Sequence, residues 1–283
     1  MAEILKGAPA AAAITEDLTA RAEKLKAAGV TPCLAILRVG RRPDDLAYER
    51  GAIKRCEKIG IRVVSVVLPA ECSQEDLLAQ LRIINQDAAI HGCLMFRPLP
   101  DRDMENTACA LLAPEKDVDG MTAGSLAAVY AGKGAGFAPC TAQAVMELLE
   151  HYGVELTGKK AVVVGRSLVI GRPVSMLLQQ KNATVTMCHT KTADLPGECR
   201  RADVLVVAAG KAGVVTKDFV SPGQTVIDVG IHVGEDGKLC GDVKFDEAEP
   251  IAAAITPVPG GVGSVTTAVL CKHVIEAAER TVR

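Results

Sequence analysis

The sequence has neither a large excess of charge nor an apolar run long enough to cross a membrane. Its 283 residues carry a net charge of −2 at pH 7, which gives no overall attraction to nucleic acid or to an anionic membrane. The longest apolar runs, such as Val204–Gly210, fall well short of the ~20 residues that span a bilayer. A nucleic-acid or membrane partner is therefore not expected, and a small-molecule ligand is.

The residue spacings typical of disulfide frameworks and metal sites are also missing from the sequence. The ten cysteines are scattered, no pair shows C-x-x-C spacing, and the five histidines are widely separated. Buried free thiols that act as small hydrophobic residues explain the cysteines, so we expect no metal and a reducing compartment, the cytoplasm. The alanine-rich run after Pro9 is flanked by charged residues and predicts a helix, not a signal peptide.

The sequence does contain apolar, strand-like runs that alternate with amphipathic, helix-like segments. This alternation is typical of parallel sheets with crossover helices, so the predicted fold class is α/β. The first half predicts a helix over 9–28 ended by Gly29, a strand over 33–40, a helix over 44–58 ended by Gly60, a strand over 62–69, a helix over 73–87 opened by a capping box at Ser73, and a strand with its exit loop over 91–100. Residues 114–141 are rich in glycine, alanine and turn residues and mark the passage to a second unit, with strands predicted over 161–165, 184–189, 204–210 and 225–230.

A glycine-containing turn follows the first strand of the second unit, in the stretch Val162–Pro173. Backbone N–H groups in such a turn and at the start of the next helix can hold a pyrophosphate. The G-x-G-x-x-G spacing is missing, because the glycines are Gly165 and Gly171, and ordinary strand-turn-helix corners also need glycine. The strands of this unit read as an open nucleotide-fold arrangement with the turn after its first strand, which favours nucleotide binding over an ordinary corner.

The second strand of this unit does not end in an acidic residue. NAD sites commonly place an acid there to bind the ribose hydroxyls, whereas this strand ends in His189, Thr190 and Lys191. Together with Arg166 and Ser167, these residues favour the additional phosphate of NADP. A solvated basic loop is the alternative interpretation.

Several stretches follow one another along the chain: DDLAYERG with Tyr48, HGCLMFRPLP, PEKDVDG, FAPCT, VVVGRSLVIGRP, TVTMCHTKT, GDVKF and ITPVPGGVGSVT. In this order they resemble the bifunctional methylenetetrahydrofolate dehydrogenase/methenyltetrahydrofolate cyclohydrolase family, often called FolD. The resemblance implies an N-terminal α/β folate-binding domain (1–138 with 264–283), a Rossmann-like NAD(P)-binding domain (139–263) and a C-terminal helix that returns to the first domain. It also implies a homodimer formed through the nucleotide domain.

The resemblance implies roles for individual residues. Tyr48 would lie against the pterin and Asp119 would bind its amino and ring N–H groups, which makes these two the expected catalytic residues. Without the family context, a turn or helix cap would be the better interpretation of Asp119, and an ordinary bend that of the glycines in Pro257–Gly263. The expected substrate-binding residues are Tyr48, Asp119, Leu99, Pro100, Pro259, Gly260 and Gly261, and the expected NADP-binding residues are Gly165, Arg166, Ser167, Gly171, Thr190 and Lys191.

Four positions depart from the family pattern. Ala52 stands where the pattern Y-x-x-x-K has its active-site lysine, and Phe96 replaces the glutamine that would orient this lysine. Asp45 replaces a usual serine, and Ser264 a usual proline. The first three departures cluster at one expected site.

No neighbour is expected to replace the lysine as a base. On a helix, Lys54 is rotated by ~200° from position 52, and Arg55 returns to the same face but is too basic to accept a proton. Oxidation of the methylene bridge needs hydride loss without proton abstraction, whereas opening of the methenyl bridge needs water and proton transfer.

The expected function is therefore NADP-dependent oxidation of 5,10-methylenetetrahydrofolate to methenyltetrahydrofolate in one-carbon metabolism, with weak or absent cyclohydrolase activity. The alternative is a catalytically silent or repurposed member that binds folate or nucleotide. The side chain of Phe96 distinguishes the two. In the pterin slot it would exclude folate, whereas beside the pterin or in the wall it would leave the dehydrogenase intact.

Overall fold

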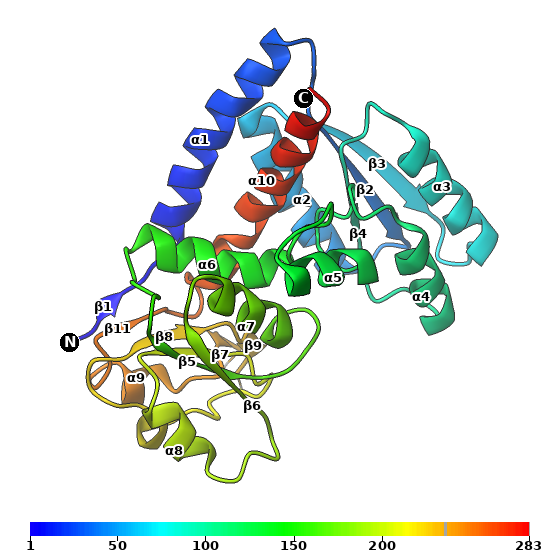
Figure 1. Cartoon of the computed structure of the whole chain (residues 1–283). Helices are drawn as coiled ribbons and strands as arrows, with labels where there is room; N and C mark the ends of the chain where they lie inside the picture. The colour runs from blue at the N-terminus through cyan, green and yellow to red at the C-terminus, as the bar shows by residue number, and fades with distance from the viewer. Residues whose placement is uncertain (235–236, 283) are drawn as a thin grey trace. The chain divides into compact units, whose positions relative to one another are not determined.

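The computed structural model describes residues 1–234 and 237–282, which form two compact units (Figure 1). Unit 1 comprises Met1–Ala12 and Thr141–Thr266, and unit 2 comprises Ala13–Cys140 and the chain from Thr267 onward. Both units are built on parallel sheets, as the α/β prediction requires. None of the helices in the described part of the chain is long and apolar enough to cross a membrane.

Unit 2 is built on a three-stranded sheet in the order β3-β2-β4. Its strands are β2 (Cys33–Val39), β3 (Arg62–Leu68) and β4 (Gly92–Met95), and its helices are most of α1 (Gly7–Ala27), α2 (Pro43–Ile59), α3 (Gln74–Gln86), α4 (Arg102–Leu111), α5 (Ala123–Ala131) and α10 (Thr266–Arg280). Cys33, Ala35 and Leu37 of β2 pack against α3 and α4, which Figure 1 shows on one side of the sheet. On the other side, Gly92 lies so close to α10 that a Cβ would be 3.2 Å from Val274.

Most helix ends in unit 2 follow local signals in the sequence. Ser73 and Asp76 form the capping box that opens α3, and α2 ends at Gly60, whose φ of 91° is left-handed. Helix α5 was not predicted, because its segment was interpreted as a turn-rich passage. Thr122 caps it by accepting a 3.1 Å hydrogen bond from the Ser125 N–H, and alanine and leucine favour the helix between its glycine-rich flanks.

Unit 1 contains a six-stranded sheet in the order β1-β11-β8-β7-β5-β6, with every neighbouring pair parallel. The strands are β1 (Glu3–Ile4), β11 (Ala254–Ile255), β8 (Thr225–Asp228), β7 (Val204–Val207), β5 (Lys160–Val164) and β6 (Thr184–Cys188). The remaining elements are α6 (Cys140–His151), α7 (Gly171–Gln180), α8 (Leu195–Arg200), α9 (Phe245–Ala248), the short helices η1 (Lys217–Phe219) and η2 (Val262–Ser264), and the hairpin β9 (His232–Val233) and β10 (Leu239–Cys240). Residues of α8 and α9 share one apolar core with the sheet.

The first residues of the chain complete this sheet. Strand β1 pairs with β11, the Leu5 N–H donates to the Ile255 carbonyl at 2.9 Å, and the Gly7 N–H donates to the Gly260 carbonyl at 2.7 Å. These contacts place residues 1–12 in unit 1, whereas the sequence analysis assigned them to the folate-binding domain. A two-residue strand leaves no periodic pattern in a sequence, so β1 was not predicted.

Candidate active site

Tyr48 and Phe96 lie in contact in unit 2. Tyr48 is on α2, and Phe96 follows β4 at the carboxyl edge of the sheet. Their ring centroids are 5.9 Å apart with an interplanar angle of 84°, an edge-to-face pair. Phe96 is only 9% exposed. The phenylalanine ring is therefore buried and packed against Tyr48.

Ala52 lies one helical turn beyond Tyr48 and is fully buried. Its methyl group can neither donate nor accept a proton. The neighbouring Arg55 is directed to other partners, because its guanidinium donates to the hydroxyls of Thr15 and Thr267 at 2.9 Å each. Lys54 is exposed, in agreement with its predicted rotation away from position 52. Neither cation occupies the place of the absent lysine.

A buried ion pair that the sequence analysis missed lies beside Tyr48. The Nε of Arg38 is 2.8 Å from Oε2 of Glu49, and the two side chains are 11% and 9% exposed. Arg38 also donates to the Gly40 carbonyl, and the Ser65 hydroxyl donates to Glu49 at 3.4 Å. The pair joins the end of β2 to α2. An arginine inside an apolar strand was the signal in the sequence.

The loops after β2 and β4 are tied together at the same edge of the sheet. Arg42 lies 3.7 Å from the carboxylate of Asp45 and donates to the Pro98 carbonyl at 3.0 Å. Leu99 packs its side chain in the core with α3 and α4, and its N–H donates to Glu105 at 2.8 Å, whereas Pro100 is exposed. Leu99 can therefore offer a ligand its backbone carbonyl more readily than its side chain.

Two aspartates in the turn region after α4, Asp117 and Asp119, have different environments. Asp117 is fully buried, and its carboxylate accepts hydrogen bonds from the N–H groups of Met121 at 3.1 Å and Thr122 at 2.7 Å. Asp119 is partly exposed, and desolvation raises the pKa of its carboxyl from 3.8 to about 6 although the Arg97 cation lowers it. Asp117 thus holds the local turn, and Asp119 is the carboxyl available to a ligand.

In unit 1, the turn after β5 has no room for side chains at its two glycines. A Cβ on Gly165, whose φ is +133°, would be 2.2 Å from the Ala208 carbonyl oxygen, and a Cβ on Gly171 would be 2.2 Å from the Gly165 oxygen. Helix α7 begins at Gly171, and Arg166 and Ser167 are exposed in the turn. The backbone can therefore approach a phosphate closely at the start of a helix.

The end of β6 lies next to this turn, because β5 and β6 are paired in parallel. The Lys191 N–H donates to Nδ1 of His189 at 3.1 Å, and the His189 N–H donates to the Thr192 hydroxyl at 2.9 Å. Thr190 and Lys191 are exposed. The structure thus brings the predicted cofactor residues of both strands to one edge of the sheet, with two exposed cations, Arg166 and Lys191.

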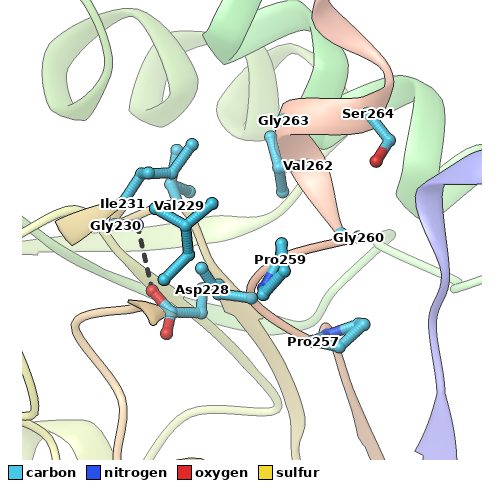
Figure 2. A pocket seen from close by; sticks show the side chains of 13 residues that line it. Asp228, Val229, Gly230, Ile231, Pro257, Pro259, Gly260, Val262, Gly263 and Ser264 are labelled. Carbon is cyan, nitrogen blue, oxygen red and sulfur yellow. Dashed lines mark hydrogen bonds between the residues drawn. The ribbon is translucent and has the colours of Figure 1, made fainter. Parts of the chain in front are cut away.

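A pocket of about 240 Å³ lies in unit 1 between the end of β8 and the loop 257–264 (Figure 2). Pro259, Gly260 and Gly261 line it, and Gly260 has a φ of +102° that favours glycine. At its floor, Asp228 accepts a 3.0 Å hydrogen bond from the Gly230 N–H. Burial raises the pKa of Asp228 to about 6, against the backbone donors that lower it.

Two family models match the chain. One, described as the catalytic domain of tetrahydrofolate dehydrogenase/cyclohydrolase, matches residues 5–119, and the other, described as the NAD(P)-binding domain of the same family, matches residues 139–282. The chain belongs to the tetrahydrofolate dehydrogenase/cyclohydrolase family. The predicted family and the α/β fold class are confirmed, and the tight turn after β5 belongs to the family's NAD(P)-binding domain.

Relatives in this family are similar over nearly their whole length. The chain is 53% identical over 281 residues to the bifunctional protein FolD of Carboxydothermus hydrogenoformans, covering 99% of this chain and 98% of that protein. It is 48% identical over 277 residues to the bifunctional protein FolD of Clostridioides difficile, covering 98% and 96%.

Solved structures from the family share the fold. The bifunctional FolD of Campylobacter jejuni superposes with a TM-score of 0.95 at 38% identity, covering 99% of this chain and all of that one. The FolD of Trypanosoma brucei, solved with NADP cofactor and an inhibitor, superposes with a TM-score of 0.91 at 38% identity, covering 100% and 99%.

Proposed function

We propose that this member of the tetrahydrofolate dehydrogenase/cyclohydrolase family oxidises 5,10-methylenetetrahydrofolate to methenyltetrahydrofolate with NADP in one-carbon metabolism, and that its cyclohydrolase activity is weak or absent. The observation that carries the proposal is the fully buried Ala52 at the family's lysine position, with Arg55 engaged by Thr15 and Thr267. Relatives named bifunctional carry out both reactions, so the weak second activity is a property proposed for this chain alone.

The parts needed for hydride transfer are retained in unit 2. Tyr48 presents an aromatic ring that can lie against a pterin, and Asp119 presents a carboxylate that can accept its amino and ring N–H groups. Phe96 is packed against Tyr48, which supports a wall position over one that fills the pterin slot. Hydride loss from a carbon between two nitrogens needs orientation and no base, because the nitrogen lone pairs stabilise the cation.

Fewer of the side chains needed for the second reaction, hydrolysis of the methenyl bridge, are present. Opening of the methenyl bridge requires a water molecule to add and protons to move, steps for which a positioned acid or base contributes ~10²–10⁴-fold. The methyl group of Ala52 and the ring of Phe96 offer no such group. Slow hydrolysis, and accumulation of methenyltetrahydrofolate, is the consequence.

The turn after β5 fits a dinucleotide that carries a 2′-phosphate. The glycine turn would hold the pyrophosphate on backbone N–H groups, and Arg166 with Ser167, Thr190 and Lys191 would hold the additional phosphate. When bound, NADP supplies the hydride acceptor. The family member solved with NADP and the lack of an acid at the end of β6 both support NADP over NAD.

We propose further that the protein is a cytoplasmic homodimer formed through unit 1. Ile231 and two residues of the β9–β10 hairpin, Val233 and Leu239, are 58%, 73% and 45% exposed, which supports an apolar contact surface in this unit. All ten cysteines are free thiols, as a reducing compartment favours. Light scattering at micromolar concentration tests the dimer, and a monomer mass would contradict it.

A paired assay on the purified protein tests the function. We expect NADPH formation from methylenetetrahydrofolate and slow hydrolysis of added methenyltetrahydrofolate. The double change Ala52→Lys with Phe96→Gln should raise hydrolysis more than either single change, because a flexible lysine needs an orienting partner. Ala52→Met with Phe96→Gln is the matched control, since methionine has similar length and no amine.

The outcomes separate the alternatives. Rapid methenyl hydrolysis by the unmodified protein would mean that another group supplies the proton transfer. Tetrahydrofolate binding without any hydride transfer would support the silent binder instead. Equal gains from the lysine and methionine variants would show that bulk, not the amine, limits hydrolysis.

A further inference from the structure

A buried carboxylate in unit 1 holds the loop that follows β7. Oδ2 of Asp242 accepts hydrogen bonds from the N–H groups of Ala209 at 2.6 Å and Gly210 at 3.0 Å, and Oδ1 accepts from the Lys211 N–H at 2.9 Å. Asp242 is fully buried. Successive backbone N–H groups that converge on one point form an anion-binding nest. In this loop the anion is a side chain of the protein itself.

A histidine from the β9–β10 hairpin adds a fourth donor to Asp242. Nε2 of His232 lies 2.7 Å from Oδ1 of Asp242, and the histidine side chain is 25% exposed. A carboxylate that accepts N–H groups at both oxygens has no hydrogen to offer, so Nε2 carries the hydrogen and donates it. This donor comes from a different element than the loop does, and it further restricts rotation of the carboxylate.

A second carboxylate fixes the backbone of Asp242. Asp228, at the end of β8, accepts hydrogen bonds from the N–H groups of Asp242 at 3.0 Å and Val243 at 2.9 Å. It also accepts from the Gly230 N–H, as Figure 2 shows. A Cβ on Gly230 would collide with the Asp242 carboxyl group. The two aspartates thus act in series and connect the end of β8 to the loop after β7.

The loop after β7 supports the glycine turn after β5. Ala208 directly follows β7, and its N–H donates to the Val164 carbonyl at 2.8 Å. Its own carbonyl oxygen is the atom that a Cβ on Gly165 would strike. Residues 209–211 continue from this contact, so a displaced loop would carry the Ala208 carbonyl with it. The backbone of Gly165, which we expect to approach the pyrophosphate, would then lose its support.

We propose that Asp242 and His232 are positioning residues for the dinucleotide: Asp242 holds residues 209–211 beside the turn after β5, and His232 holds Asp242. The inference rests on the proposed function only in taking NADP as the ligand of that turn. Neither side chain acts on the cofactor directly, and no proton is transferred. Without them the loop would have to be ordered when NADP binds, and this ordering lowers the affinity.

Variants of His232 test the proposal while the three backbone contacts of Asp242 stay in place. His232→Gln keeps an N–H donor near the Nε2 position, whereas His232→Leu removes the donor and keeps a similar size. Asp242→Asn replaces an acceptor oxygen by an amide that would face the donors of the loop. Asp203→Asn is the matched control, because Asp203 accepts the Lys160 N–H at 2.8 Å just before β7, at the opposite edge of the sheet.

The first readout is NADP affinity in calorimetry. His232→Leu should weaken NADP roughly fivefold, the factor for loss of one typical hydrogen bond, and Asp242→Asn should weaken it more than ~10-fold. His232→Gln and Asp203→Asn should bind NADP as the unmodified protein does. In the dehydrogenase assay, His232→Leu should raise KM for NADP and leave KM for methylenetetrahydrofolate unchanged, whereas a general loss of folding would affect both.

The second readout is hydrogen exchange at the amides of residues 209–211 in the ligand-free protein, followed by NMR. Exchange should be faster in His232→Leu and Asp242→Asn, because an N–H without its acceptor opens to solvent more often, and unchanged in His232→Gln. If Asp242→Asn fails to fold, the two His232 variants decide the question.

Unchanged NADP affinity in His232→Leu would overturn the proposal, as would equal weakening in His232→Leu and His232→Gln. Faster exchange in the loop with unaltered NADP affinity would also overturn it, because the loop would then not support the cofactor turn. NADP binding without any hydride transfer in the unmodified protein would overturn the proposed function alone, since calorimetry and hydrogen exchange need no folate.

Discussion

Replacement of Asp119 by asparagine should stabilise the protein at neutral pH. The pKa of this carboxyl is raised from 3.8 to about 6, so the folded protein holds the proton more tightly than the unfolded chain does. Stability therefore falls as the pH rises from ~4 to ~6, and the ionised carboxylate weakens the fold above that window. At ~1.4 kcal/mol per pKa unit, the penalty at pH 7 is ~3 kcal/mol. Asparagine has no charge to desolvate.

Urea unfolding followed by circular dichroism between pH 4 and 7.5 measures this effect, and the sequence has no tryptophan for fluorescence. The gain in the free energy of unfolding for Asp119→Asn should be near zero at pH 4 and reach ~1–3 kcal/mol at pH 7. Asp117→Asn is the control, and it should destabilise at pH 7 because that carboxylate accepts two backbone N–H groups. The reasoning is refuted if Asp119→Asn destabilises at pH 7 or shows the same gain at pH 4.

Three further changes test other parts of the site. Gly165→Ala should lower the free energy of unfolding by more than ~2 kcal/mol and abolish NADP binding in calorimetry, because its Cβ would collide with a carbonyl. The control Gly158→Ala, at a φ of +73° in open space, should lower the free energy of unfolding by ~1 kcal/mol. Equal losses of stability in the two variants would contradict the steric argument. Arg166→Ala should weaken NADP much more than NAD, which lacks the 2′-phosphate, and parallel losses would assign the arginine another role. Glu49→Leu should lower the free energy of unfolding in urea by ~3–5 kcal/mol, because it leaves Arg38 without its carboxylate partner. The double variant Arg38→Met with Glu49→Leu should recover most of this loss. A double variant as unstable as the single one would show that the ion pair itself is needed.

The parts of the fold that the sequence predicted are those set by local patterns. The capping box at Ser73 and the left-handed Gly60 lie within a few residues of the helix ends that they determine. The two glycines of the cofactor turn were also predicted from their positions after a strand, although the collision that excludes a side chain at Gly165 depends on Ala208, which directly follows the neighbouring strand β7. The local sequence predicted where these glycines lie, whereas the steric reason for them comes from contacts with other parts of the fold.

The contacts that the sequence did not predict join distant residues. Whether the Phe96 side chain fills a ligand slot or forms part of a wall depends on its packing against Tyr48 on another element. No sequence pattern around position 96 contains that contact. The same holds for Arg55, whose two hydroxyl partners come from α1 and α10, and for Asp242, whose partner Lys211 lies 31 residues away. Periodicity describes one element at a time, so these side-chain partners required the structure.

The pairing of β1 with β11 has a consequence for biosynthesis. The ribosome makes Glu3 and Ile4 long before their strand partner, Ala254–Ile255. Unit 2 likewise waits for α10, because its own chain is interrupted by residues 141–266. Neither unit can therefore be completed before β11 and α10 have been made, and a nascent chain stalled before β11 exposes the edge of β8 to other strands.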